Sequence, residues 1–204
     1  MNSVMQTTEI KNVIETYLPS FERLLKSVDR ASIERISQRL CMARAAEATI
    51  YVAGNGGSAA IASHWVNDLG KATKRSGSPP VRVMSLSDNV SWLTALANDE
   101  GYERVFAGQL ENFAKQGDVL VVISSSGNSA NLVRAVEVAR TRGVTTIGLL
   151  GFDGGTLKQL TDDCLLVQTA KGSYGLVEPM HEMICHLLTA CVTAAAEESP
   201  AAFK

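Results

Sequence analysis

The chain has 204 residues, of which 46% are hydrophobic, and its formal net charge is −2. This length and composition suit one α/β domain with a buried core. The 19 basic residues are scattered rather than grouped on one segment, which argues against nucleic acid as a partner, so we expect a small molecule or another protein.

The four cysteines show no CxxC spacing, and the first residues lack the basic and apolar regions of a signal peptide. We therefore expect reduced thiols and a cytoplasmic protein. The longest nearly apolar run begins at Ile184 and is shorter than the roughly 20 residues that span a bilayer, which predicts a buried helix and no membrane association.

Two helices are expected before the first strand. Apolar residues recur every three or four positions from Ile10 to Val28, where Pro19 should kink or divide the helix, and a second helix should run from about Ser32 to Ala46. These segments, within residues 1–47, could cap the core of the same chain. The long apolar stripe equally suits pairing between subunits, and we favour a role in oligomerisation.

Five short runs rich in β-branched residues follow, without strict polar alternation, at residues 49–53, 81–86, 118–123, 144–150 and 164–168. Helical patterns lie between and after them, for example over 128–142 and 178–196. Alternating strands and helices predict a parallel sheet covered on both faces, with right-handed crossovers. Residues 48–197 are therefore expected to form a Rossmann-like α/β core with a five-stranded parallel sheet.

A glycine-rich turn follows the first strand. Gly54-Asn55-Gly56-Gly57-Ser58 should lie at the carboxyl end of the sheet, where α/β proteins bind ligands. Glycine lets the backbone approach a ligand closely, and the first N–H groups of the next helix favour anions. A tight turn that binds nothing is the alternative.

A serine-rich turn, Ser-Ser-Ser-Gly-Asn-Ser at residues 124–129, follows the third strand. Its hydroxyls and the helix N-terminus after it predict a cup that binds a phosphate through neutral donors. No GxxxxGK[ST] loop occurs, and no GxGxxG follows the first strand, so a sugar phosphate fits better than a nucleotide. Helix capping alone would use only one of the hydroxyls.

Acidic residues and histidines recur at helical spacing. His64 and Asp68 are four apart, so they share a helix face, either as an ordinary contact or to bind a metal or exchange a proton. His181 and His186 are separated by about 140° around a helix, so one of them should be structural. Glu178 and His186 are about 12 Å apart along a helix axis. Both can reach one ion only if Glu178 lies at the helix start, as Pro179 allows, or if they come from different subunits.

Together these motifs resemble a known family. The GNGGS turn, the H-x3-[acidic] helix, NDEGY at 98–102, GDVLVVISSSGNS, GFDGG at 151–155 and the late E-x2-H-x4-H helix look like the SIS (sugar isomerase) domain of bacterial phosphoheptose isomerases. The resemblance runs from about residue 8 to residue 194. It implies a three-layer SIS domain that converts sedoheptulose 7-phosphate into D-glycero-D-manno-heptose 7-phosphate for lipopolysaccharide and other surface glycans.

The resemblance also implies roles for individual residues. Asp68 and His186 match the acid/base positions, and a zinc ion, one per subunit, would be bound by His64, Asp68, Glu178 and His186. The implied substrate-binding residues are Asn55, Gly56, Gly57, Asp68, Asn98, Asp99, Ser124, Ser125, Ser126, Ser129 and Glu178. The family is typically a homotetramer with active sites between subunits.

Two positions depart from the family pattern, which usually has glutamate in place of Asp68 and glutamine in place of Glu178. Aspartate is shorter by one methylene, and a base about 1 Å out of place can lose about 100-fold in rate. The alternatives are an isomerase of another phosphosugar and a non-catalytic sugar-phosphate sensor that binds a protein, as one relative binds the bacterial replication initiator. The retained histidines and Asp68 favour an enzyme.

Overall fold

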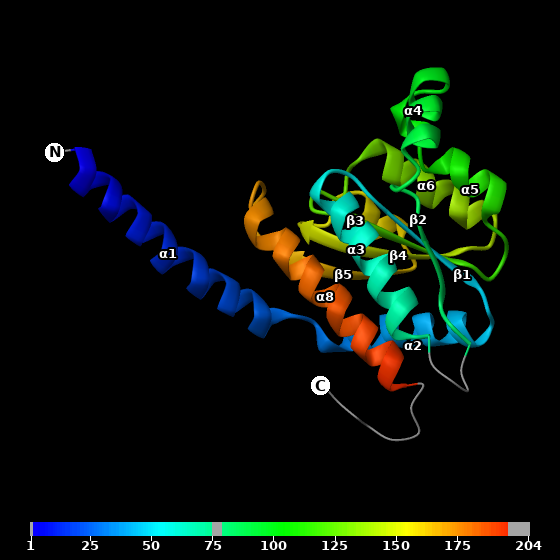
Figure 1. Cartoon of the computed structure of the whole chain (residues 1–204), viewed down its shortest axis with the longest axis horizontal. Coiled ribbons are helices and arrows are strands. Elements are labelled where there is room, and N and C mark those ends of the chain that lie inside the picture. The colour runs from blue at the N-terminus through cyan, green and yellow to red at the C-terminus, as the bar shows by residue number, and fades with distance from the viewer. Residues whose placement is uncertain (1, 75–78, 196–204) are drawn as a thin grey trace.

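The computed structural model describes residues 2–74 and 79–195, with side chains from residue 8 onward. Its centre is a five-stranded, fully parallel sheet with the strand order β2-β1-β3-β4-β5 (Figure 1). The strands are β1 (Thr49–Gly54), β2 (Arg82–Ser85), β3 (Val119–Ser124), β4 (Thr145–Phe152) and β5 (Asp163–Gln168). All five predicted strands are confirmed, with ends that differ by one or two residues.

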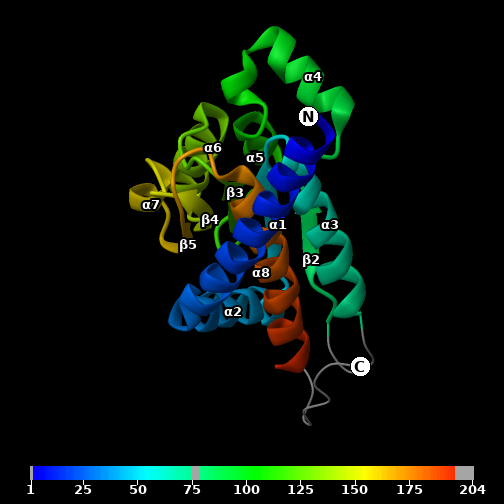
Figure 2. The ribbon, with the colours of Figure 1, turned by 90° about the vertical axis from the view of Figure 1, so that its left-hand side faces the viewer.

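Helices cover both faces of the sheet, which confirms the three-layer α/β prediction. They are α1 (Asn2–Ser27), α2 (Arg30–Ala45), α3 (Gly57–Ala72), α4 (Val90–Asp99), α5 (Ala107–Phe113), α6 (Ala130–Thr141), α7 (Leu157–Leu160) and α8 (Tyr174–Ala194). Helices α2, α3 and α8 pack on one face, and α5, α6 and α7 pack on the other. Helix α4 stands out at one end of the molecule (Figures 1 and 2).

The strands lack polar alternation because both of their faces are buried. In β3, Val121 and Ile123 belong to the core beneath α2, α3 and α8, whereas Leu120 and Val122 belong to the core beneath α5 and α6. Every residue of β3 is buried. A strand in this position has to be apolar on successive residues, which is the pattern of a covered parallel sheet.

The strand order fixes where a ligand can bind. The chain passes from β1 outward to β2 and then returns to place β3 on the other side of β1. At such a reversal the connections leave the sheet in opposite directions and open a crevice at the carboxyl ends of the two strands. The glycine-rich turn after β1 and the serine-rich turn after β3 both lie at this crevice.

Of the two predicted effects of Pro19, a kink or a division, the division is wrong, because Pro19 lies within the single helix α1. Most of α1 extends away from the rest of the chain (Figure 1). The apolar residues on this part are exposed, with 62% for Ile10 and 63% for both Val13 and Leu18. Helix α2 was predicted correctly to within a few residues and is packed on the core.

The last helix begins four residues before its predicted start at Glu178, so Pro179 lies inside α8 rather than in its first positions. A proline has no N–H to donate to the carbonyl four residues before it, here that of Gly175. The Tyr17 hydroxyl of α1 donates to the Gly175 carbonyl oxygen at 2.6 Å and so satisfies that acceptor. A contact from α1 thus takes over the bond that the proline removes.

No helix of the described chain is both long enough and apolar enough to cross a membrane. The final residues of the predicted core, 196 and 197, lie outside the described ranges.

One buried carboxylate joins the starts of the central strands. Asp118 is fully buried, and its two oxygens accept hydrogen bonds from the backbone N–H groups of Thr49, at 2.8 Å, and Lys115, at 3.0 Å.

We expect Asp118→Ala to lower the free energy of unfolding by about 2–3 kcal/mol because both donors lose their partner. Thermal unfolding measures this loss as a fall of the midpoint temperature by about 2–4 °C for each kcal/mol. The exposed Glu137→Ala should shift the midpoint by no more than about 2 °C, and equal shifts in both variants would contradict this role.

Of His181 and His186, one was predicted to be structural, and the structure shows that it is His181. It is fully buried on α8, and burial lowers its pKa to about 4. The Leu150 backbone opposes this shift slightly, although neither ring nitrogen makes a hydrogen bond of normal geometry. The unfolded chain therefore binds a proton on His181 below about pH 6.5, whereas the folded chain binds it only below about pH 4.

We expect the free energy of unfolding to fall between these pH values by up to roughly 3 kcal/mol on account of His181. Urea unfolding at pH 7 and pH 4.5 measures this loss. His181→Leu removes the titrating group, so its loss over the same interval should be smaller. An identical pH dependence in both proteins would show that the pKa of His181 is not lowered in the folded state.

Candidate active site

A small cavity of about 150 Å³ lies at the crevice between the ends of β1 and β3. It is lined by Asn55, Ser58, Ile123, Ser124, Ser125, Ser126, Ser129, Leu132, Tyr174 and Glu178. We call this cavity the cup. Four of the serines that the sequence assigned to a phosphate site face it, and no lysine or arginine does, so its donors are neutral.

Two of the four serine hydroxyls of the cup accept hydrogen bonds within their own turn, and the other two do not. Ser129 precedes α6 but makes no side-chain capping bond, and the Ser125 hydroxyl is buried without a hydrogen-bond partner in the described chain. Ser124 and Ser126 accept bonds from the backbone N–H groups of Gly127 and Asn128. Local hydrogen bonds therefore account for Ser124 and Ser126 but not for Ser125 and Ser129, and Ser125 has a hydroxyl without a partner in the described chain.

The GFDGG segment holds the serine-rich turn in place. Gly127 has a φ of +65°, and a Cβ there would lie 1.9 Å from the backbone oxygen of Gly154, so only glycine fits. The Asn128 side-chain oxygen accepts from the Thr156 N–H at 2.9 Å, and the Leu157 N–H donates to the Gly127 carbonyl at 2.9 Å. Two turns that are far apart in sequence thus form one rigid wall.

Asn55 is fixed in the glycine-rich turn by its neighbours. Its amide exchanges two hydrogen bonds of 2.9 Å with the amide of the buried Asn131, and the Tyr102 hydroxyl donates to the Asn55 side-chain oxygen at 3.1 Å. Asn98 and Asp99, also expected at the substrate, lie at the exposed end of α4, bond to each other and do not line the cup.

Glu178 projects from α8 into the cup, toward the start of α3. A Cβ added at Gly57 would lie 2.7 Å from each carboxylate oxygen of Glu178, so glycine at residue 57 makes room for this carboxylate. The N-terminus of a helix favours a negative charge. Gly56, with a φ of +55° and open space around it, forms the preceding turn.

A second group of side chains lies farther along the same two helices. Asp68 Oδ2 is 3.4 Å from His64 Nε2 and 3.1 Å from His186 Nδ1, while Glu182 Oε1 is 3.6 Å from His186 Nε2 and also contacts His64 Nδ1. Each imidazole therefore lies between two carboxylates. We call these four residues the histidine–carboxylate cluster. It contains three of the four predicted zinc ligands, and Glu178 is not among them.

Glu182 was missed by the sequence analysis. It lies four residues before His186 and four after Glu178, which is the same spacing that identified His64 and Asp68. The structure also adds Tyr102, Asn131 and Tyr174 to the surroundings of the cup. None of these three belongs to a spacing pattern that marks a ligand site.

The cluster suits a divalent cation. Its members His64, Glu182 and His186 each offer a ligand atom, and these atoms all lie within 4.8 Å of one another. Two imidazoles and a carboxylate are donors that Zn²⁺ accepts. The neighbouring Cys185 is buried, which raises the pKa of its thiol well above the usual range, with further contributions from Glu182 and Asp68. It therefore does not supply a thiolate at neutral pH.

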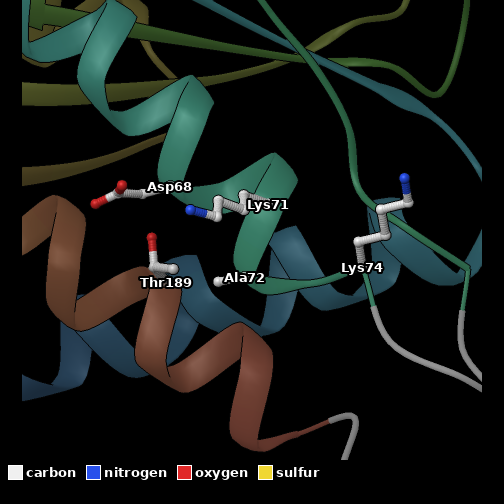
Figure 3. Close-up of a pocket in the computed structure, with 5 residues that line it drawn as sticks. All are labelled: Asp68, Lys71, Ala72, Lys74 and Thr189. Carbon is white, nitrogen blue, oxygen red and sulfur yellow. The ribbon is translucent and has the colours of Figure 1, made fainter.

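Asp68 also borders an open hollow of about 430 Å³ between α3 and α8. Figure 3 shows Asp68 and Lys71 extending from α3 toward α8, with Thr189 across from them. The Thr189 hydroxyl accepts a hydrogen bond from the Trp65 ring N–H at 3.1 Å, which joins the two helices below the cluster. The Asp68 carboxylate is thus accessible from outside and close to the cationic Lys71.

Comparisons with known proteins agree on one family. The sequence pattern of the SIS domain matches residues 16–151. The phosphoheptose isomerase of a Nitratiruptor species is 46% identical over 144 residues, 70% of this chain and 75% of that protein. A phosphoheptose isomerase of Helicobacter pylori is 37% identical over 184 residues, 89% of each chain. The structure of the phosphoheptose isomerase of Neisseria gonorrhoeae superposes with a TM-score of 0.82 and 27% identity, covering 90% of this chain and 98% of that one.

The unpartnered Ser125 hydroxyl allows a sharp test of the cup. Ser125→Ala should weaken binding of sedoheptulose 7-phosphate by roughly 10-fold or more, because a hydrogen bond to a charged group contributes about 1.5–3 kcal/mol. Its unfolding free energy should hold steady or rise, because no protein bond is lost. Ser37 on α2 has an equally buried, unpartnered hydroxyl away from the cup, so Ser37→Ala is the matched control and should bind normally. Calorimetry measures both, and unchanged binding in Ser125→Ala would contradict the assignment.

Proposed function

This chain belongs to the SIS domain family, and we propose that it is a phosphoheptose isomerase that converts sedoheptulose 7-phosphate into D-glycero-D-manno-heptose 7-phosphate. One observation carries the proposal: a cup of serine hydroxyls at the ends of β1 and β3, which Glu178 of α8 also lines, lies next to a cluster of two imidazoles and two carboxylates farther along α3 and α8. The first would bind the substrate and the second would move protons.

The spacing of the two groups supports an extended sugar phosphate. On α8, Glu178 lines the cup, Glu182 follows one turn later and His186 two turns later, which corresponds to rises of about 6 Å and 12 Å. A phosphate on the last carbon would bind in the cup through Ser124, Ser125, Ser126 and Ser129. The open chain would then extend along the helices and bring C1 and C2 toward Asp68 and His186.

The reaction needs two proton transfers on adjacent carbons. The ketose carries its carbonyl at C2, so removal of a proton from C1 with protonation of the C2 oxygen gives a cis-enediol, and return of a proton to C2 with loss of the C1 hydroxyl proton gives the aldose. Asp68 and His186 would perform these transfers, one as base and the other as acid, and the 3.1 Å between Asp68 Oδ2 and His186 Nδ1 lets them exchange a proton. Asn55, Gly56, Gly57, Asn98, Asp99 and Glu178 are the further residues that we assign to the substrate.

The histidine–carboxylate cluster would also hold the zinc ion that the resemblance implies, one per subunit. His64 and His186 supply imidazole ligands, and the carboxylates beside them complete a donor set that fits Zn²⁺. A bound zinc ion supplies Lewis-acid polarisation of a carbonyl. The resemblance assigns Asp68 and Glu178 as the carboxylate ligands, and of these two only Asp68 contacts the histidines.

We further propose that residues 1–47 serve oligomerisation, in a homotetramer with active sites between subunits. The exposed apolar side chains of α1 support this, because they leave a long stripe of the helix without cover in the single chain. A shared site would also give a role to Asn98 and Asp99, which do not line the cup of their own chain. A cytoplasmic location and a role in supplying heptose for surface glycans stay predictions.

The activity is tested by incubating the protein with sedoheptulose 7-phosphate in D₂O and following the products by NMR, first without metal and then with added zinc. We expect the aldose to form with deuterium at C2. His186→Ala should lower the rate by about 10²–10⁴, the usual contribution of acid/base catalysis. Asp68→Asn should abolish exchange, whereas Asp68→Glu, which keeps the carboxylate, should retain it.

Glu137→Gln on the exposed face of α6 is the control and should keep the wild-type rate. If the wild-type protein binds the sugar phosphate saturably but shows neither turnover nor deuterium exchange under either condition, the isomerase proposal is wrong.

A further inference from the structure

We infer that Glu182 is a metal ligand of this chain, in a His64–Glu182–His186 triad, and that Asp68 lies outside the triad and orients both imidazoles. The inference rests on the proposed function only for the presence of a divalent ion in the cluster. It changes the identity of the ligands from those that the resemblance implies, because it replaces Glu178 and moves Asp68 from the ion to the imidazoles.

The positions of the donor atoms favour this triad. A zinc ion with ligand distances of about 2.0–2.2 Å in a tetrahedral site places its donors about 3.4 Å from one another. Glu182 Oε1 and His186 Nε2 are 3.6 Å apart, and His64 Nδ1 faces the same Glu182 oxygen. All three donors lie within 4.8 Å of one another, so only small side-chain adjustments are needed to place an ion between them.

Asp68 has the position of a supporting carboxylate. A metal-bound histidine usually donates its second ring N–H to a carboxylate or carbonyl, which fixes the ring and raises its basicity. Here the ring nitrogens that are not the ones nearest Glu182, His64 Nε2 and His186 Nδ1, lie 3.4 Å and 3.1 Å from Asp68 Oδ2. One carboxylate oxygen is therefore close to both imidazoles and would orient them, and the other oxygen would remain available for proton transfer.

Glu178 is not among the residues whose donor atoms gather in the described chain. It is eight residues from His186 on the same uninterrupted helix, a rise of about 12 Å, and its carboxylate lies against Gly57 in the cup. Glu182 is one turn from His186 and already contacts both histidines. The triad can therefore form from α3 and α8 of a single chain, and three protein ligands leave a fourth position open for a substrate oxygen or water.

The test compares two carboxylates of the same helix by metal binding rather than by activity. Apo protein, Glu182→Gln and the matched control Glu178→Gln are titrated with Zn²⁺ by calorimetry, and the d–d absorption of the Co²⁺-loaded proteins is recorded. We expect Glu182→Gln to lose more than about 100-fold in affinity, since loss of a supporting residue alone costs about 10–100-fold. Its Co²⁺ spectrum should change, whereas Glu178→Gln should retain both affinity and spectrum.

Asp68→Asn separates a supporting residue from a ligand. It should lose less affinity than Glu182→Gln and keep the Co²⁺ spectrum of the wild type. A loss in Glu178→Gln or in Asp68→Asn that equals or exceeds the loss in Glu182→Gln would overturn the triad, and so would a wild-type protein that binds no divalent ion. Circular dichroism of each apo variant confirms that it is folded.

These results are independent of the proposed activity. A wild-type protein that binds zinc through Glu182 but does not isomerise the sugar would contradict the proposed function alone. Isomerisation by a protein that binds no metal would contradict the triad alone.

Discussion

The packing of α3 against α8 is the contact on which the whole site depends. The two helices run side by side in the same direction, so residues at successive turns of one meet residues at successive turns of the other. Gly57 meets Glu178, and one level below, His64 meets Glu182. The hydrogen bond between Trp65 and Thr189 joins the helices within the core, where burial of their apolar faces keeps them together.

This arrangement places the proposed substrate-binding residues near the N-terminal ends of α3 and α8 (the upper level) and the proposed proton-transfer residues farther along both helices (the lower level). The upper level carries the serine hydroxyls and helix starts that we propose bind a phosphate, and it lies at the point where the strand order reverses. The lower level concentrates titratable groups around two imidazoles. Because both levels are carried by helices anchored on one sheet, their separation is set by the fold and changes little with side-chain motion.

The sequence predicted the sheet well because its strands are short, continuous apolar runs, such as 118–123, that only a covered parallel sheet accommodates. It predicted His64 with Asp68 because both lie within one helix at a fixed spacing. The predicted start of α8 was wrong because Gly175 and Pro179 are typical of a helix end or start. The hydrogen bond that satisfies the Gly175 carbonyl comes from Tyr17, 158 residues earlier in the chain. The spacing of Glu182 from His186 was visible in the sequence, but its contact with His64 depends on which face of α8 meets α3.

The Tyr17–Gly175 hydrogen bond has a consequence for the proposed self-association through α1. Tyr17 lies on the α1 segment whose apolar side is exposed, while Gly175 is in the first turn of α8, between Tyr174 of the cup and the proline-weakened backbone. Whatever fixes the orientation of α1 also stabilises that turn. If α1 mediates the proposed self-association and the cup binds the proposed phosphate, a partner that holds α1 in this orientation would also stabilise the turn at the cup, and linkage would make the two events favour each other by the same free energy.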